Sequence, residues 1–392
     1  MALKFHITVT YLSLILGFIL GAKSSLFDVR TYGAKPNTDI SQALSTAWKS
    51  ACAAPTQSVL FIPSGVFYLK RAILQGPCKA PIKVQLQGTL RALNDLTGFK
   101  DEDGWVIFEH INDLTLMGGG TFDGQGKSVW GKQCGQGKYC SKYPMNIRFD
   151  YITNSLIQDI TSLDSKQFHM NVLGCQNVTF LHVHVIANGN SPNTDGIHIG
   201  RSFMINITDV NIQTGDDCIS LGDGSKKITI TKVTCGPGHG ISVGSLGKYM
   251  NEQPGVFVRN CTLINTMNGL RIKTWPNSFV GLASNIHFED IIMENVGNPI
   301  YIDQEYCPWN QCNKAVPSKV QIKDVSFKDI RGTSATTNAI NFICSSGFPC
   351  QNVEVVNIDL RYNGKQGHIT SQCKNIKPRI LGIHNPTACL AS

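Results

Sequence analysis

A short pattern of residues recurs six times in the second half of the chain, and it constrains the fold more than any other feature. A polar residue and a small residue are followed by an apolar, a variable and an apolar residue. The first three copies are 22 residues apart and the later ones 29 to 40, spacings that are typical of solenoid repeats. The copies are DGIHI from Asp195, DCISL from Asp217, HGISV from His239, NGLRI from Asn268, NPIYI from Asn298 and NAINF from Asn338.

Longer runs rich in β-branched residues lie between these copies. They have no helical periodicity and are separated by Asn, Asp and Gly, which is typical of strands joined by turns. A coil of such strands cannot bury its apolar side alone and must stack on its neighbours. The sequence therefore predicts an all-β fold, a single-stranded right-handed parallel β-helix. The alternative is a domain of two sheets without coil repeats. The runs include NVTFLHVHV from Asn177, INITDVNI from Ile205, KITITKVT from Lys227, NIHFEDIIM from Asn285, VQIKDVSF from Val320 and NVEVVNIDL from Asn352.

Two further patterns concern the end and the turns of this solenoid. The ends of a solenoid need caps, and the segment from Ile40 to Cys52 has the apolar spacing of a short helix, so we expect it to cap the N-terminal end. Asn268, Asn298 and Asn338 stand at one repeat position and predict a ladder of stacked side chains. The apolar positions of the helix are Ala43, Leu44, Ala47 and Trp48.

The same repeat brings carboxylates together. Asp195, Asp217 and His239 open three successive copies, and Asp216 directly precedes Asp217. Because adjacent parallel strands lie about 4.8 Å apart, these side chains are expected to stand in one column. Carboxylates this close resist joint ionisation and destabilise a fold. Acid/base catalysis and cation binding are the two functions that would use them. The alternative is that each aspartate only caps a turn.

Two cations follow on the same side of the predicted coil. In NGLRI, Leu270 and Ile272 hold the apolar positions, so strand alternation turns Arg271 and Lys273 outward. Such cations suit a substrate that carries carboxylates, or they neutralise the neighbouring aspartates. Tyr306 lies shortly after the next copy, where it is either a stacking platform for a sugar or part of the packing.

The first residues predict secretion. Lys4 precedes an apolar run from Ile7 to Gly21 that is too short for a comfortable membrane span. We expect residues 1–22 to be a secretion signal peptide and residues 23–392 one extracellular, monomeric domain without a membrane contact. The alternative is an N-terminal anchor helix. The net charge of +8 favours a polyanionic partner, and an acidic polysaccharide fits a secreted protein better than nucleic acid does.

All fourteen cysteines lie after this segment, and an even number in a secreted chain predicts disulfides. Cys175 and Cys261 lie within strand-like runs and are expected to be buried free thiols. Glycosylation sequons begin at Asn177, Asn206 and Asn260. The expected disulfide pairs are Cys52–Cys78, Cys134–Cys140, Cys218–Cys235, Cys307–Cys312, Cys344–Cys350 and Cys373–Cys389.

Four motifs in the order SPNTDGIHI, TGDDCISL, GHGISVGSLG and RIKT carry a resemblance to a known family. The chain resembles the plant polygalacturonases, inverting glycoside hydrolases with a β-helix fold that act on pectic galacturonan in the cell wall. The resemblance extends from FDVRTYGAKPNTD at Phe27 to the C-terminal cysteines. Within the family the chain is most similar to the pollen-type exopolygalacturonases.

The resemblance implies a role for each residue of the column. Asp216 matches the general acid that protonates the glycosidic oxygen, and Asp195 and Asp217 match the carboxylates that position and deprotonate the attacking water. His239 matches a supporting residue beside the acid. No cofactor and no metal are implied.

The resemblance also implies a substrate groove. Arg271 and Lys273 match ligands of the substrate carboxylate, and Asn193 and Tyr306 match groove residues. The similarity to the pollen-type branch predicts exo cleavage, which releases single units from the non-reducing end. Exo cleavage requires loops that block the groove, and cysteine-bearing candidates run from Gln133 to Tyr143 and from Tyr306 to Val316. Both could instead be ordinary surface insertions.

Three other functions remain open at this point. An endo-polygalacturonase would have the same catalytic residues and a groove open at both ends. A pectate lyase would hold Ca²⁺ with the aspartates. A non-catalytic wall-binding protein would have kept the fold without the chemistry.

Overall fold

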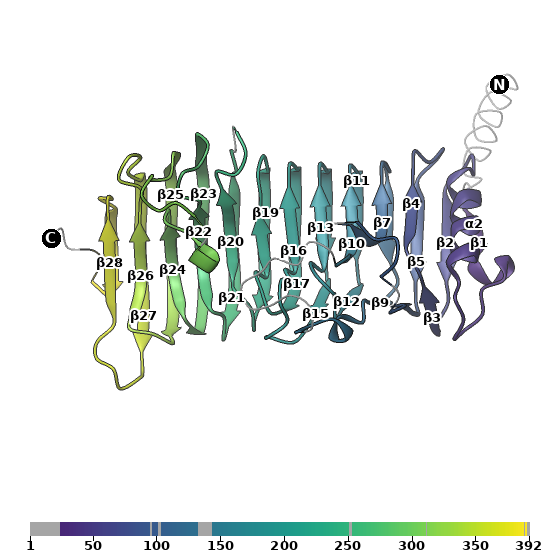
Figure 1. Ribbon diagram of the computed structural model, residues 1–392, viewed down its shortest axis with the longest axis horizontal. Helices are drawn as coiled ribbons and strands as arrows, with labels where there is room; N and C mark the ends of the chain where they lie inside the picture. The colour runs from purple at the N-terminus through teal and green to yellow at the C-terminus, as the bar shows by residue number, and fades with distance from the viewer. Residues whose placement is uncertain are drawn as a thin grey trace, which may run out of the picture.

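The computed structural model describes residues 24–94, 96–100, 103–131, 143–250, 253–310, 312–387 and 389. Within these ranges the chain winds into one elongated solenoid of parallel strands, with the N-terminal and C-terminal parts at opposite ends (Figure 1). Each strand pairs with the equivalent strand of the next coil, and a parallel connection of this kind is right-handed in nearly all proteins. The predicted right-handed parallel β-helix is confirmed.

One side of the solenoid is a sheet of eleven strands, one strand to each coil. This sheet contains the repeated copies that the sequence singled out. In chain order its strands are β4 (Ala72–Gln75), β7 (Gly104–Glu109), β10 (Met145–Asp150), β13 (Met170–Leu173), β16 (Ile197–Gly200), β18 (Ile219–Leu221), β20 (Ile241–Leu246), β22 (Asn268–Thr274), β24 (Asn298–Asp303), β26 (Asn338–Ile343) and β28 (Thr370–Lys374).

The other strands form an eighteen-stranded sheet. In the early coils it has two arms. One arm consists of β1 (Ser25–Asp28), β2 (Ser58–Ile62), β5 (Ile82–Leu86), β8 (Leu114–Met117), β11 (Thr153–Gln158) and β14 (Gln176–Leu181). The second arm consists of β3 (Val66–Leu69), β6 (Thr89–Ala92), β9 (Thr121–Asp123), β12 (Thr161–Leu163) and β15 (His184–Ile186). The arms merge in β17 (Phe203–Gln213), β19 (Lys226–Cys235), β21 (Val256–Ile264), β23 (Gly281–Val296), β25 (Val320–Ser334), β27 (Gln351–Tyr362) and β29 (Arg379–Asn385).

The corner between the two arms is made by single residues with a left-handed backbone. Asp209 in β17, Lys232 in β19 and Asn260 in β21 have φ values of 53° to 55° and follow one another in register. Asn and Asp tolerate this conformation better than most residues, which explains why they punctuate the β-branched runs. The predicted ladder joins Asn298 to Asn268 at 3.1 Å. It does not reach Asn338, whose amide oxygen is buried without a partner in the described structure.

The core fills the inside of the coils. Ile197, Ile219, Ile241, Leu270 and Ile300 are register partners in successive strands, and all are fully buried. Aromatic rings stack in the same way, as in Phe288–Phe327 with ring centroids 5.2 Å apart. Each coil thus buries its apolar residues on the equivalent residues of its neighbours, as the repeat predicted.

Helix α2 (Ser41–Cys52) covers the N-terminal end, as expected. Its buried face includes the predicted residues Ala43, Leu44, Ala47 and Trp48. Trp48 Nε1 donates to the Gln75 carbonyl oxygen at 3.0 Å, which ties the helix to the first coils. Three short 3₁₀ helices are η1 (Val29–Tyr32), η2 (Gly126–Ser128) and η3 (Pro308–Asn310). No helix of the described residues is long and apolar enough to cross a membrane.

Five of the six expected disulfides are present in the described residues, and Cys134–Cys140 lies outside them. Cys175 and Cys261 are free and buried, also as expected. Both the signal peptide predicted for residues 1–22 and most of the candidate loop from Gln133 to Tyr143 fall outside the described ranges. The five pairs are Cys52–Cys78, Cys218–Cys235, Cys307–Cys312, Cys344–Cys350 and Cys373–Cys389.

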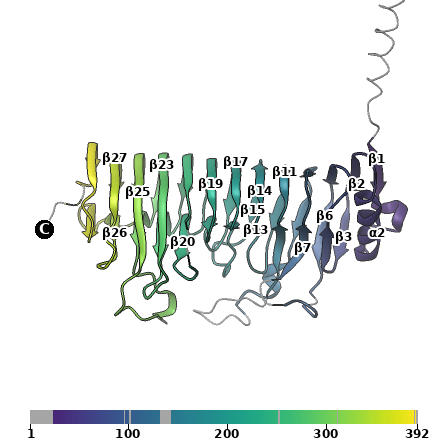
Figure 2. The same ribbon diagram turned by 90° about the horizontal axis from the view of Figure 1, so that it is seen from above.

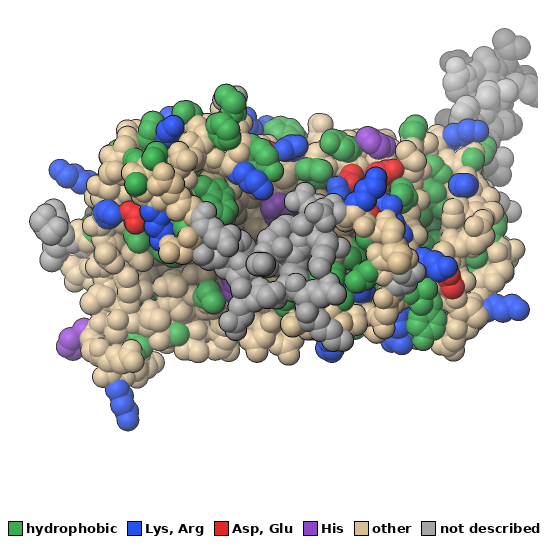
Figure 3. Space-filling model, viewed as in Figure 1, with side chains coloured by type: hydrophobic (Ala, Val, Ile, Leu, Met, Phe, Trp, Pro, Cys, Tyr) green, Lys and Arg blue, Asp and Glu red, His purple; other side chains and the backbone are tan. Residues whose placement is uncertain are grey.

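Long connections project from one side of the solenoid (Figure 2). The most prominent described connection follows β24 and contains η3 and the Cys307–Cys312 disulfide. The face seen in Figure 3 is hollowed near its middle, with histidine side chains visible within and Lys and Arg side chains around it. The repeat therefore builds a regular core, while the irregular connections shape one face.

Candidate active site

The predicted column is formed by three turns that precede strands of the eleven-stranded sheet. Asp195, Asp217 and His239 each stand two residues before a register-matched isoleucine in β16, β18 and β20. The backbone bonds continue through these turns, since Gly196 N donates to the Asp217 carbonyl at 2.9 Å. The ligand atoms of Asp216, Asp217 and His239 lie within 4.8 Å of one another. The structure thus brings the predicted residues together.

Hydroxyl groups hold two of these turns against each other. Thr194 and Thr214 occupy neighbouring coils, and their Oγ1 atoms are 2.8 Å apart. The Gly215 amide donates to Thr194 Oγ1 at 3.0 Å. A Cβ at Gly215 would collide with the backbone of Ser191, so only glycine fits here. The disulfide to Cys235 anchors Cys218, directly after the paired aspartates.

Asp217 is an ionised carboxylate held by two cations. Its Oδ1 accepts from Arg271 at 2.7 Å and from Ser242 Oγ at 2.8 Å, and its Oδ2 accepts from Lys273 at 2.7 Å. Burial alone would raise the pKa of Asp217, but Lys273 and Arg271 outweigh burial and hold that pKa well below its usual range. The two cations therefore favour the ionised form of Asp217.

Asp195 is in the opposite electrostatic situation. It is buried, and no cation of the described residues pairs with it directly; Ser220 Oγ donates to its Oδ2 at 2.8 Å. Burial raises the pKa of Asp195 well above the ordinary value, and the negative charges of Asp216 and Asp217 raise it further. The two deeper carboxylates therefore differ in proton affinity although they are neighbours in one column.

Asp216 is the most exposed of the three carboxylates. Its side chain is 21% exposed, against 2% for Asp217. Asp216 Oδ1 lies 3.0 Å from His239 Nδ1 and accepts from the Asp217 backbone amide at 2.8 Å. Asp216 and His239 therefore form a pair at the open side of the cluster, where a bound molecule can reach them.

Arg271 and Lys273 lie on the predicted side of their strand, opposite the core residues Leu270 and Ile272, but they are covered there and hardly reach solvent. They are only 8% and 6% exposed. Asp217 forms ion pairs with both cations on one side. The Tyr306 ring covers their other side, with its centroid 5.8 Å from Arg271 Cζ and 5.1 Å from Lys273 Nζ. Trp275 meets Tyr306 edge-on at 5.3 Å. Tyr306 thus packs on the cations, an arrangement that cation–π attraction favours.

The other predicted site residues are more loosely connected to the cluster. Asn193 is half-buried with a φ of 52° in the turn that leads to Asp195, which places it beside the column. The sequon residues Asn177 and Asn260 are exposed on the eighteen-stranded sheet, and Asn206 on β17 is half-buried. The sequons therefore lie on a different sheet from the cluster.

The cluster does not fit a calcium ion. Ca²⁺ takes six to eight oxygen ligands. Both oxygens of Asp217 already accept from Arg271 or Lys273, and His239 offers nitrogen. A divalent cation would have to displace two positive charges from Asp217. The carboxylates are better suited to handling protons.

Sequence reasoning missed three residues that support the carboxylates. His198, Ser220 and Ser242 occupy the variable position of the repeat and are register partners, with Arg271 next in line. Ser220 and Ser242 donate to Asp195 and Asp217. Their signal was present in the sequence, because polar residues recur at this outward position in DGIHI, DCISL and HGISV.

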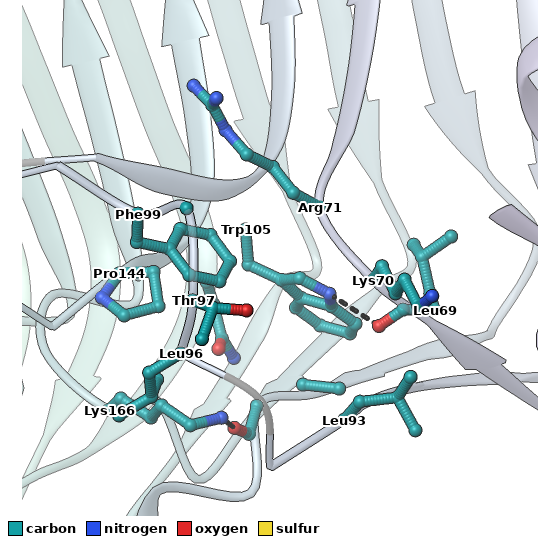
Figure 4. Close-up of a pocket in the computed structure, with 14 residues that line it drawn as sticks. Leu69, Lys70, Arg71, Leu93, Leu96, Thr97, Phe99, Trp105, Pro144 and Lys166 are labelled. Atoms are coloured by element: carbon teal, nitrogen blue, oxygen red, sulfur yellow. Dashed lines mark hydrogen bonds between the residues drawn. The ribbon is translucent and has the colours of Figure 1, made fainter.

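A cavity of about 260 Å³ lies toward the N-terminal end of the molecule (Figure 4). Trp105 forms part of its wall and donates from Nε1 to the Leu69 carbonyl at 3.1 Å. Lys166 lines it from the turn before β13, one coil before the turn of Asp195, and its Nζ donates to the Gly124 carbonyl. Burial lowers the pKa of Lys166 to about 8. Arg71 adds a second positive group to the lining.

Comparison with known proteins identifies the family. A "Polygalacturonase" of Nicotiana tabacum is 50% identical over 394 residues, covering 100% of this chain and 99% of the relative. An "Exopolygalacturonase" of Oenothera organensis is 54% identical over 358 residues, covering 90% and 99%. The structure of an endo-xylogalacturonan hydrolase from Aspergillus tubingensis has a TM-score of 0.79 and 23% identity, covering 91% of this chain and 99% of that one. Residues 52–389 match the model of glycosyl hydrolases family 28, and the chain belongs to that family.

Proposed function

We propose that this polygalacturonase hydrolyses the α-1,4-galacturonosyl bonds of pectin and polygalacturonate with inversion, releasing single galacturonic acid units from the non-reducing end. The observation that carries the chemistry is the set of three adjacent carboxylates in three different environments. Hydrolysis with inversion needs one carboxyl that gives a proton and another that takes one. Groups whose surroundings separate their proton affinities suit such a division of work.

Asp216 is the general acid in this proposal. The acid must reach the glycosidic oxygen of a bound polymer, and Asp216 is the most exposed carboxylate of the cluster. Its proton passes to the oxygen of the leaving sugar as the glycosidic bond breaks. His239, 3.0 Å from Asp216 Oδ1, orients the acid and compensates its charge after the proton has left.

Asp195 and Asp217 handle the attacking water. Water attacks the anomeric carbon from the face opposite the leaving oxygen, and one of its protons passes to a carboxylate. Asp217 is charged and fixed by Arg271 and Lys273, so it orients the water as an acceptor. Asp195 has the higher proton affinity, because burial and its anionic neighbours raise its pKa, and it takes the proton. All bonds and protons of the hydrolysis are then accounted for.

The substrate class follows from charge as well as from the family. The chain carries a net charge of +8, and galacturonan carries one carboxylate on each unesterified sugar. Lys166 and Arg71 line the cavity toward the N-terminal end. The net charge favours an acidic sugar polymer, whereas Arg71 is already paired with Asp103 at 2.7 Å and Lys166 Nζ donates to the Gly124 carbonyl.

Exo action rests on two supporting observations. The relative from Oenothera organensis, 54% identical over 90% of this chain, is named an exopolygalacturonase. The connection after β24 carries a disulfide and brings Tyr306 over the two cations, so it narrows the site from one side. An endo-polygalacturonase is the alternative, since other relatives are named simply polygalacturonase.

Secretion to the cell wall is part of the same proposal. The apolar run from Ile7 to Gly21 follows Lys4, as in signal peptides. Five disulfides in the described residues favour an oxidising compartment. The exposed sequon residues Asn177 and Asn260 are accessible to glycosylation. We expect the mature protein to act as a monomer.

Product analysis tests the proposed exo action. Polygalacturonate is incubated with the purified protein, and reducing ends, viscosity and chain lengths are followed together. We expect monomer from the first time point while viscosity falls slowly. Early oligomers with a rapid loss of viscosity would indicate an endo enzyme. A rise in ultraviolet absorbance from unsaturated products would replace the hydrolase assignment with a lyase.

Substitution of the proposed acid tests its role. Asp216→Asn keeps the shape of the side chain and removes the proton, so turnover should fall by about 10² to 10⁴-fold. The melting temperature should stay close to that of the wild type, because Asp216 is partly exposed. A variant that keeps more than about a tenth of the wild-type turnover would show that another group is the acid.

The buried cations allow a test between two roles. Lys273→Met removes one charged hydrogen bond and leaves Asp217 with Arg271 as its cation, so we expect a loss of turnover together with a loss of about 1.5–3 kcal/mol in the free energy of unfolding. Arg331→Ala is the matched control, because Arg331 forms a surface ion pair with Asp290 at 2.8 Å. That pair should contribute at most about 1 kcal/mol. A Lys273→Met protein of normal stability and turnover, with a raised KM alone, would assign Lys273 to substrate binding instead.

A further inference from the structure

His198 is connected to the catalytic cluster through Ser220. We propose that His198 is a positioning residue, which acts through Ser220 to hold Asp195 in its ionised, proton-accepting form. The inference rests on the proposed role of Asp195 as the base and adds a group that does not itself touch the substrate. Four lines of evidence support it: the direction of the hydrogen bonds, the packing of the ring, the protonation of His198 and a parallel arrangement at Asp217.

The hydrogen bonds can run in only one direction when Asp195 is ionised. Ser220 Oγ lies 2.8 Å from Asp195 Oδ2 and 2.7 Å from His198 Nδ1. A hydroxyl has one proton to donate. If Ser220 donates it to the carboxylate, Ser220 must accept from His198 Nδ1–H. The proton on Nδ1 therefore fixes the hydroxyl toward Asp195.

Packing holds the imidazole in this orientation. His198 on β16 is the register partner of Ser220 on β18. The Phe168 ring lies against it with centroids 5.1 Å apart and an interplanar angle of 33°. Gly222 lies on the Nε2 side, where an added Cβ would be 3.3 Å from that nitrogen. The ring is thus confined on both sides and keeps Nδ1 on Ser220.

The imidazole is neutral at ordinary pH. Burial lowers the pKa of His198 to about 4; the charge of Asp217 opposes this effect, Lys273 adds to it, and Asp223 opposes it weakly. A neutral imidazole has one ring proton, and the bond to Ser220 assigns it to Nδ1. His198 and Ser220 together therefore supply Asp195 with a hydrogen-bond donor and add no positive charge. Burial and the charges of Asp216 and Asp217 favour the protonated form of Asp195. The donated hydrogen bond favours the ionised form instead, as the charge of Lys273 also does.

Asp217 has the same arrangement one coil later. Arg271 Nε donates to Ser242 Oγ at 3.1 Å, and Ser242 Oγ donates to Asp217 Oδ1 at 2.8 Å. In both series of hydrogen bonds, a nitrogen on one strand donates to a serine on the adjacent strand, and that serine donates to an aspartate. The donor is a cation at Asp217 and a neutral imidazole at Asp195. The charged donor therefore stands at Asp217, the carboxylate whose pKa is held low, and the neutral donor at Asp195, whose pKa burial raises.

The test compares variants of the chain with a matched His–Ser pair elsewhere. Ser220→Ala removes the hydrogen bond donated to Asp195, and His198→Ala removes the donor that fixes the Ser220 hydroxyl toward Asp195. His198→Asn keeps a donor in the form of its side-chain amide. His287→Ala is the control, because His287 Nδ1 lies 2.8 Å from Ser326 Oγ on the other sheet, away from the cluster. The measurement is the pH profile of kcat/KM on polygalacturonate.

We expect the acid limb of the profile to move upward by about one pH unit in Ser220→Ala, because a hydrogen bond to a charged group is lost. It should move in the same direction, by less, in His198→Ala, because the Ser220 hydroxyl is then no longer fixed toward Asp195. His198→Asn and His287→Ala should keep the limb of the wild type. Loss of activity or of melting temperature with an unmoved limb would overturn the proposal. If His198→Ala does not fold, Ser220→Ala tests the same chain with a smaller change.

A second readout separates this inference from the proposed function. Carboxyl-carbon NMR titration of Asp195 in the wild type and in Ser220→Ala needs no substrate. If the hydrogen bonds from His198 through Ser220 hold Asp195 ionised, the titration midpoint of Asp195 is higher in Ser220→Ala than in the wild type. Equal midpoints would refute the proposal. Absence of hydrolysis by the wild type would count against the proposed function alone, because the titration would still measure the effect of Ser220 on Asp195.

Discussion

The backbone pairing between successive coils is the constraint on which the rest of the structure depends. Adjacent parallel strands lie about 4.8 Å apart. The register at the repeat positions of the eleven-stranded sheet is kept from β16 through β24, with one shift between Val243 and Leu246 near the end of β20. Whatever stands at one position of the repeat is therefore stacked on its equivalents. Apolar residues at the inward positions become a continuous core, and polar residues before and between them become columns. One constraint produces both the stability of the solenoid and the crowding of charge at its site.

Three carboxylates this close together would destabilise the fold if nothing compensated their charges. Each of the three is compensated by a different kind of group. Asp217 receives two buried cations, Asp195 receives only a serine hydroxyl, and Asp216 keeps contact with solvent. Like charges at this distance cannot share one protonation state. In the proposed inverting mechanism, their separate environments divide the work among an acid, a fixed anion and a base. The electrostatic difference between neighbours is thus what turns a stacked column into a catalytic site.

Much of this could be predicted from the sequence, because the decisive information was periodic. The 22-residue spacing located the strands and placed Asp195, Asp217 and His239 in one column, and short cysteine spacings identified pairs such as Cys218–Cys235. The burial of Arg271 and Lys273 could not be read in the same way, because their cover comes from Tyr306, which lies on a long connection outside the repeat. The cavity beside Trp105 was missed for a related reason, since irregular turns of several coils line it. The periodic sequence therefore predicts the strands and the columns of side chains that successive coils have in common. It does not predict the conformation of the long connections between them.

The central claim is that three adjacent carboxylates in different environments perform a single displacement by water. The stereochemistry of the first product tests this most directly. Proton NMR during the first minutes of digestion of α-linked galacturonate oligomers distinguishes the anomers of the newly formed reducing end before they equilibrate. A single displacement predicts that the β-anomer appears first and the α-anomer later. Initial formation of the α-anomer would indicate two displacements through a covalent intermediate and would contradict the account.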